Sequence, residues 1–116
     1  MIAGTGSYLP EKILTNAELE SLVDTSDDWI TSRTGIKERR IAAEGEFTSH
    51  MATKAAEKAL EQTGIEAADL QLIIVATITP DTLTPATACY VQQNLGCLQA
   101  VAFDISAACS LSLIHI

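Results

Sequence analysis

The residue with the clearest capacity for covalent chemistry is Cys109, at the end of the stretch AVAFDISAAC. The small residues just before it let the backbone pack closely and leave the sulfur unshielded. A free thiol with a pKa of roughly 8.5 is mostly protonated at neutral pH, but the unpaired N–H groups at the start of a helix favour the thiolate. The pattern is typical of a cysteine nucleophile. A buried structural cysteine is the alternative that the local sequence leaves open.

A second group of residues could bind a ligand that carries a flat ring and phosphates. Trp29, the single tryptophan, and Arg33 are four residues apart on a predicted helix, so they share a face, and Thr25 lies just ahead of them. An indole beside a guanidinium forms a platform for a π-system with phosphates nearby. The alternative is a tryptophan half-buried against the core with the arginine lying over it.

A cluster of basic residues favours the binding interpretation of this region. The chain has seven lysines and arginines against fifteen acidic residues, and four of the seven lie between positions 33 and 40. A local positive patch on an acidic protein suits a phosphorylated or acidic partner. The four residues are Arg33, Lys37, Arg39 and Arg40.

The composition limits the class of protein. With 47% hydrophobic and 19% charged residues, the chain is globular, and its net charge of −8 argues against a nucleic acid or an anionic membrane as partner. Three cysteines without CxxC spacing and two isolated histidines predict free thiols and no metal site. No apolar run is long enough to span a bilayer, and no signal peptide precedes the first strand. We therefore expect a cytoplasmic protein.

The elements that must position these residues follow from apolar periodicity and from capping residues. The GTGS stretch near the start lacks the third glycine of a dinucleotide fingerprint and is read as the end of a strand. The β-branched run LIIVATI predicts a strand buried on both faces, as in a parallel sheet covered by helices. Cys89 and Cys97 are expected to be structural. The predicted elements are a strand at 2–9, a helix at 16–23, a helix from Ser26 to Thr34–Gly35, a helix from 48 to 63, a strand at 70–79, a helix at 85–95 and a strand from 100.

The order of these elements indicates an α/β protein with layered helices and right-handed crossovers. Two segments, DTSDDWITSRTGIKERR and the FDISAAC approach to the cysteine, together make the chain resemble the β-ketoacyl-acyl-carrier-protein synthase III family of condensing enzymes. The resemblance covers positions 1–109. It implies an α/β thiolase-like fold, of which this chain would be the first, amino-terminal half only, with a mixed sheet layered with helices.

The resemblance also implies roles for individual residues. Cys109 matches the acyl-accepting cysteine, and Thr25, Trp29 and Arg33 match residues around the adenine and phosphates of coenzyme A. Lys37 lies in the basic segment near the same tunnel mouth. The loop at Thr84 matches the family's dimer contact, where a bulky residue closes the partner's acyl pocket, so a threonine there leaves the acyl-chain preference open.

The implied activity is a two-step acyl transfer that initiates type II fatty-acid synthesis. The Cys109 thiolate takes the acyl group from acetyl-CoA or another short acyl-CoA, which is a substrate; no cofactor is implied. Malonyl-acyl carrier protein then loses carbon dioxide and attacks the acyl-cysteine. The histidine and asparagine that promote decarboxylation come from the carboxy-terminal half in the family, and His115 matches no motif. A homodimer is expected for the full-length protein.

The last seven residues depart from the family pattern. Residues 110–116 read SLSLIHI, where the family continues with small and aromatic residues, so we expect an unrelated run-on and a truncated, inactive chain. Two alternatives remain. One is a non-catalytic fragment with at most coenzyme A binding, and the other is a related thiolase-fold enzyme that starts polyketide synthesis.

Overall fold

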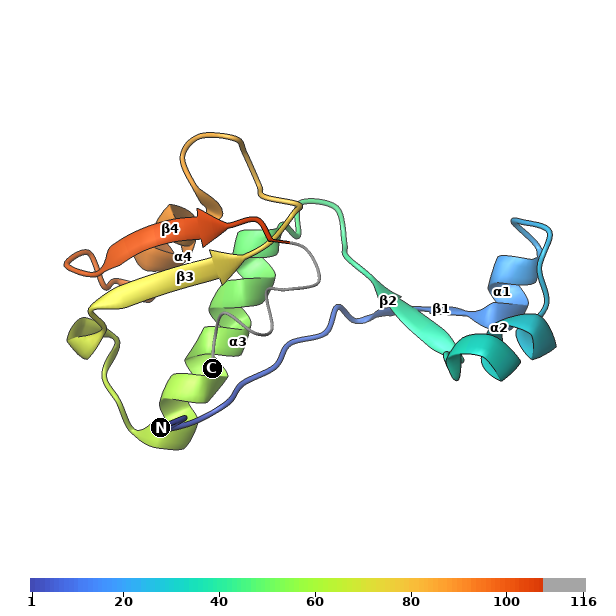
Figure 1. The fold of residues 1–116 in the computed structure, drawn as a ribbon, viewed down its shortest axis with the longest axis horizontal. Coiled ribbons are helices and arrows are strands. Elements are labelled where there is room, and N and C mark those ends of the chain that lie inside the picture. The colour runs from blue at the N-terminus through green and yellow to red at the C-terminus, as the bar shows by residue number, and fades with distance from the viewer. Residues whose placement is uncertain (108–116) are drawn as a thin grey trace. The chain divides into compact units, whose positions relative to one another are not determined.

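The computed structural model describes residues 1–107, and Cys109 lies outside them. The chain separates into two compact units, which Figure 1 shows as ribbons. The hairpin unit is Leu9–Glu46, and the sheet unit is Met1–Tyr8 together with the described residues from 47 to 107. The elements in chain order are β1 (Lys12–Thr15), α1 (Asn16–Glu20), α2 (Asp27–Thr34), β2 (Glu38–Ile41), α3 (Thr48–Thr63), a 3-10 turn (Ala67–Asp69), β3 (Leu72–Ala76), α4 (Thr87–Leu95) and β4 (Val101–Ile105).

In the hairpin unit, two short strands enclose two short helices. β1 pairs with β2 in antiparallel register, from Lys12 opposite Ile41 to Thr15 opposite Glu38. The predicted helix starts are confirmed, because Thr15 caps α1 in a capping box with Glu18, and Ser26 caps α2. Helix α1 ends at Glu20, earlier than the predicted residue 23. The two strands were missed, because four-residue strands give little alternation to read.

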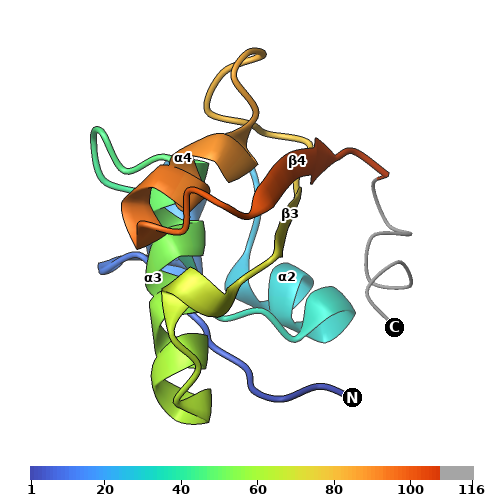
Figure 2. The ribbon, with the colours of Figure 1, turned by 90° about the vertical axis from the view of Figure 1, so that its left-hand side faces the viewer.

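In the sheet unit, two parallel strands pack against two helices. β3 and β4 pair from Leu72 opposite Val101 to Ala76 opposite Ile105, which confirms the predicted parallel pairing. Figure 2 shows α3 and α4 on one side of these strands. Val75, Ala88 and Val91 form the buried core between strand and helix. Within the described residues, no helix is long and apolar enough to cross a membrane.

The prediction that β3 is buried on both faces is wrong for this chain. The strand covers Leu72–Ala76 rather than 70–79, and Val75 is its buried residue. On the opposite face Leu72 is 50% exposed, and its neighbours on β4, Val101 and Phe103, are 62% and 41% exposed. In residues 1–107 helices cover one face of the sheet, so an apolar face stays open.

The predicted strand at 2–9 is also wrong. Residues 1–10 form no strand within the described structure and run past α3, where the Thr5 N–H donates to Gln62 Oε1 at 2.7 Å. A Cβ on Gly6 would collide with the backbone at Ala55, and one on Gly4 would collide with Thr63. The two glycines therefore serve the close approach of this segment to a helix.

The helices of the sheet unit largely follow the prediction. α3 spans Thr48–Thr63, as expected, and the residue that follows it, Gly64, has a φ of 69°. α4 begins at Thr87, two residues after the predicted Pro85, and ends at Gly96 with a φ of 73°. A left-handed residue after the last turn is the position where glycine carries no Cβ penalty. The carboxyl ends of both helices could therefore be read from the sequence.

Candidate functional site

The structure brings Trp29 and Arg33 together on the surface of α2. The Arg33 guanidinium carbon lies 4.7 Å from the centre of the Trp29 ring, a cation–π contact. Trp29 is 53% exposed, and the buried residue of the helix is its neighbour Ile30. A half-exposed indole with Arg33 over its ring fits both the ligand platform and the alternative of a half-buried tryptophan covered by the arginine, so the ligand role of the pair stays a prediction.

A hollow of about 520 Å³ lies next to this pair in the hairpin unit. Thr25 and Trp29 both line it, so the structure places three of the predicted ligand residues together. Asp24 also lines the hollow, and its negative charge disfavours a phosphate directly beside it. The described residues around the hollow are Val23, Asp24, Thr25, Ser26 and Trp29.

Lys37 is not among the residues that line this hollow. It follows α2 and has an exposed side chain, while its backbone oxygen accepts a hydrogen bond from the Asn16 N–H at 3.2 Å. Its charge helps to lower the pKa of Asp27. These contacts place Lys37 near the first turn of α2, and its predicted role at the ligand stays a prediction.

Two arginines of the predicted basic patch bind groups of the protein itself. Arg39 donates to Asn16 Oδ1 at 2.8 Å and to the Leu14 backbone oxygen at 3.4 Å. Arg40 donates to the Pro10 backbone oxygen at 3.2 Å and pairs with Glu38 at 3.5 Å. Both arginines therefore bind groups of their own unit, which leaves Arg33 as the arginine of the predicted ligand platform.

Asn16 holds α2 in place, and no local sequence pattern predicts this role. Asn16 is 2% exposed, and its Nδ2 donates to Asp27 Oδ1 at 2.7 Å and to the Ile36 backbone oxygen at 2.8 Å. These two partners lie at opposite ends of α2. Arg39 donates to the amide oxygen of Asn16, so both ends of the side chain are used. Asn16 thus fixes the helix that carries Trp29 and Arg33, although from the sequence it could only be read as a cap.

The carboxylate of Asp27 is stabilised by the same contacts. Hydrogen bonds from Asn16 and Thr31 lower its pKa, and Lys37 adds a smaller effect in the same direction. A lowered folded-state pKa stabilises the fold above the usual pKa of aspartate, and this contribution is lost as the pH falls through the folded-state value. The contribution of Asp27 to the stability of the hairpin unit is therefore present at neutral pH and is lost on acidification.

The cysteines within the described residues carry no catalytic arrangement. Cys97 is buried and its Sγ lies 3.6 Å from the Gln92 backbone oxygen, which fits its predicted structural role. Cys89 is free and only half-buried, so it is less central to the core than predicted. Between residues 1 and 107, no three metal-ligating side chains gather at one place. The predicted nucleophile, Cys109, lies four residues beyond the end of β4.

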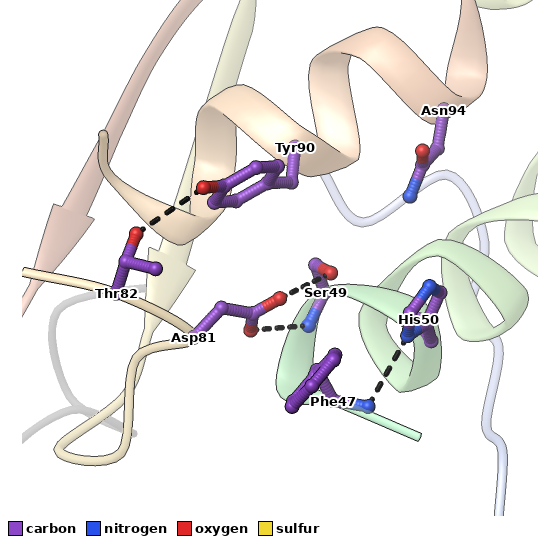
Figure 3. A pocket seen from close by; sticks show the side chains of 7 residues that line it. All are labelled: Phe47, Ser49, His50, Asp81, Thr82, Tyr90 and Asn94. Carbon is purple, nitrogen blue, oxygen red and sulfur yellow. Dashed lines mark hydrogen bonds between the residues drawn. The ribbon is translucent and has the colours of Figure 1, made fainter. Parts of the chain in front are cut away.

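A second hollow, of about 310 Å³, lies on the sheet unit between α3, α4 and the loop before α4 (Figure 3). Its polar groups are already engaged. Tyr90 and Thr82 share a hydroxyl contact at 3.3 Å, and His50 Nδ1 accepts the Phe47 N–H at 3.2 Å. Asp81 binds Ser49, at the start of α3. The hollow is built from helix-capping contacts, and the hydroxyls of Ser49, Thr82 and Tyr90 that line it are held in hydrogen bonds.

Comparison with known proteins defines the class first. A scan against models of protein families gave no match. Among solved structures, the 3-oxoacyl-[acyl-carrier-protein] synthase III of Aquifex aeolicus superposes with a TM-score of 0.90 at 58% identity, over 94% of this chain and 35% of that one. The priming β-ketosynthase of the R1128 polyketide pathway gives a TM-score of 0.90 at 38% identity, over 94% and 33%. The chain therefore has the fold of part of a thiolase-like condensing enzyme, as expected.

Two relatives found by sequence share one name within this class of condensing enzymes. A β-ketoacyl-[acyl-carrier-protein] synthase III of Caldanaerobacter subterraneus is 64% identical over 109 residues, covering 94% of this chain and 33% of the relative. The protein of the same name from Bradyrhizobium diazoefficiens is 56% identical over 110 residues, covering 95% and 34%. The chain thus spans about a third of the length of the relatives it matches. It corresponds to part of a β-ketoacyl-[acyl-carrier-protein] synthase III, which confirms the resemblance seen in the sequence.

Proposed function

We propose that the complete protein condenses a short acyl-CoA with malonyl-acyl carrier protein to give 3-oxoacyl-acyl carrier protein. The observation that carries this proposal is the 64% identity over 109 residues to a relative named for that activity. The exposed Trp29–Arg33 pair supports it independently, because the pair suits the adenine and the phosphates of coenzyme A. The acyl-CoA is a substrate, and the mechanism needs neither a metal nor a further cofactor.

In the proposed mechanism Cys109 is the acyl acceptor. Its thiolate attacks the thioester carbonyl of the acyl-CoA, a new carbon–sulfur bond forms, and coenzyme A leaves as a thiolate that takes up a proton. Malonyl-acyl carrier protein then loses carbon dioxide, and the resulting carbanion attacks the acyl-cysteine. The carbon–sulfur bond to Cys109 breaks and the thiolate is restored, so the acyl group passes from sulfur to carbon and the overall reaction needs no oxidant or reductant.

We propose that this 116-residue chain is inactive by itself. The resemblance places the base that promotes decarboxylation outside these residues, and the chain spans about a third of its relatives. The whole protein is proposed to be a cytoplasmic homodimer, with the exposed loop at Thr84 contributing to the contact between subunits. The division of the chain at residue 109 stays a prediction.

The proposal is tested in the full-length protein. Labelled acetyl-CoA should leave one acetyl group on the wild-type enzyme, located by peptide mass spectrometry at Cys109, and none on Cys109→Ser. Trp29→Ala and Arg33→Ala should each raise the KM for acetyl-CoA about tenfold, which corresponds to a loss of about 1.4 kcal/mol of binding. Arg40→Ala is the matched control, because Arg40 binds Pro10 and Glu38 within the same unit.

Two results would overturn the proposal. One is a labelled acyl-enzyme that persists in Cys109→Ser, which would move the nucleophile to another residue. The other is an equal rise in KM for Arg33→Ala and Arg40→Ala, which would mean that the platform contributes no specific contact.

A second candidate function is the priming step of polyketide synthesis. It rests on the R1128 priming β-ketosynthase, which shares the fold with a TM-score of 0.90 but only 38% of the residues. Malonyl-loaded carrier proteins from fatty-acid and polyketide systems, offered in competition, separate the two. Preference for the polyketide carrier would favour this second function.

A further inference from the structure

Asp104, in the stretch that leads to Cys109, binds the start of a helix. Its Oδ2 accepts the Thr87 N–H at 2.7 Å, and its Oδ1 accepts the Ala88 N–H at 2.8 Å. Thr87 and Ala88 are both 0% exposed. The two donors are the first two residues of α4, so the carboxylate of a strand residue satisfies N–H groups that have no partner within the helix.

Helix α4 needs this carboxylate as a cap, because the residue at its own N-cap position has no polar side chain. The residue before the helix is Ala86, which among the described contacts supplies no side-chain hydrogen bond. An alanine is one of the poorest residues at this position, since it leaves the first N–H groups unpaired. Asp104 therefore acts as the cap from β4, seventeen residues further along the chain than Thr87.

The same contact constrains β4. Within residues 1–107 this strand is paired on one edge, with β3, and the last backbone contact between them is the Thr77 N–H to the Ile105 oxygen at 3.1 Å. A strand held along one edge can shift sideways. The two hydrogen bonds of Asp104 add a second constraint, directed toward the helix layer, one residue before the strand ends.

A second carboxylate of the sheet unit, that of Asp81, also caps a helix. Asp81 accepts the Ser49 N–H at 2.9 Å and the Ser49 hydroxyl, at the start of α3 (Figure 3). Its own N–H donates to Thr87 Oγ1 at 3.1 Å. Asp81 and Asp104 thus each cap one helix with two hydrogen bonds. They differ in position, since Asp81 lies in the loop before α4 and Asp104 lies five residues before the proposed nucleophile.

We propose that Asp104 is a positioning residue for Cys109. This inference rests on the proposed function, because it takes Cys109 to be the acyl acceptor. By binding α4, Asp104 fixes the carboxyl end of β4, and Cys109 follows that end by four positions in the sequence. Reacting groups that are misplaced by about an ångström lose up to a hundredfold in rate, so the fixed end of β4 contributes to acylation.

The test compares Asp104→Asn with Asp81→Asn in the full-length enzyme. Each variant replaces one capping carboxylate with an isosteric amide that cannot accept both hydrogen bonds equally well. Both variants should lower the melting temperature by similar amounts. Asp104→Asn should also lower the single-turnover rate of Cys109 acylation by acetyl-CoA about tenfold, with a KM within twofold of wild type. Asp81→Asn should keep both kinetic values within twofold.

Equal acylation rates in the two variants, at a similar loss of thermal stability, would overturn the inference and leave Asp104 with a capping role alone. If Asp104→Asn does not fold, Asp104→Glu replaces it, because it keeps the charge but displaces the carboxylate by one methylene. The same tenfold loss is expected, and a wild-type rate would overturn the inference. Absence of acetyl label at Cys109 in the wild-type enzyme would instead overturn the proposed function itself.

Discussion

At the scale of single residues, Asn16 shows how a buried polar side chain can organise a small unit. Its amide donates to both ends of α2 and accepts from Arg39. A buried amide whose partners are all satisfied adds to stability, whereas removal of the amide leaves those partners unpaired. Without the Asn16 amide, the Ile36 oxygen and the Arg39 guanidinium would each lose a hydrogen-bond partner.

We predict that Asn16→Ala destabilises the hairpin unit by about 2–4 kcal/mol, because several hydrogen bonds are lost at a site that is 2% exposed. Urea unfolding followed by Trp29 fluorescence measures this, since the only tryptophan lies in that unit. The matched control is Asn94→Ala in the sheet unit, where the exposed amide makes one hydrogen bond, to Thr53 at 3.1 Å. A midpoint for Asn16→Ala as high as that of the control would contradict the assignment.

At the scale of elements, the amino-terminal segment and α3 pack with little space between them. Gly6 lies where any Cβ would meet the α3 backbone at Ala55 and Ala59. Lys58 holds the same segment through the Ser7 backbone oxygen at 2.9 Å, and Lys54 lies 4.3 Å from the centre of the Tyr8 ring. The segment is therefore held by backbone proximity and by lysines of the helix rather than by a sheet.

We predict that Gly6→Ala displaces this segment from α3 at a cost of about 1–3 kcal/mol, the usual range for an overpacked contact. Hydrogen exchange of the α3 amides and the thermal midpoint report the change. Thr5→Ser is the control, because the Thr5 contact to Gln62 uses the backbone N–H and survives the substitution. Unchanged exchange in Gly6→Ala would show that the segment is not packed on the helix.

At the scale of the whole molecule, the open face of the sheet is the main liability of the 116-residue chain. Leu72, Val101 and Phe103 lie on the face of the sheet opposite the helices and are 50%, 62% and 41% exposed. Monomers rarely leave such a contiguous apolar patch in contact with water. The chain spans about a third of the length of the relatives it matches, and within residues 1–107 these side chains stay exposed.

We predict that the 116-residue chain self-associates at about 10–100 µM, the range where exposed apolar surface drives association. Light scattering coupled to size exclusion measures this. A Val101→Thr, Phe103→Ser double variant should shift the chain toward monomer, whereas Leu83→Ser should not, although Leu83 is 97% exposed, because it lies in a loop away from the sheet. A monodisperse wild-type monomer at the upper concentration would refute the prediction.

Much of this molecule follows from local sequence. The caps Thr15 and Ser26 and the glycines at 35, 64 and 96 mark helix ends by rules that act within a few residues, and the structure confirms them. The pairing of Trp29 with Arg33 follows equally from helical periodicity. The resemblance to the synthase family also rests on short segments that can be read in the sequence.

Tertiary structure decided what depends on partners distant in the chain. The glycines at 4 and 6 were read as a strand end, but both lie against α3 with no room for a Cβ. The buried amide of Asn16 and the capping carboxylate of Asp104 find their partners 11 to 20 and 16 to 17 residues away, beyond the reach of any local rule. The β-branched run of β3 specified a strand but could not specify how many of its faces are covered. Hydrogen-bonding and packing partners are set by the path of the chain in space, and that path exists only once the fold is complete.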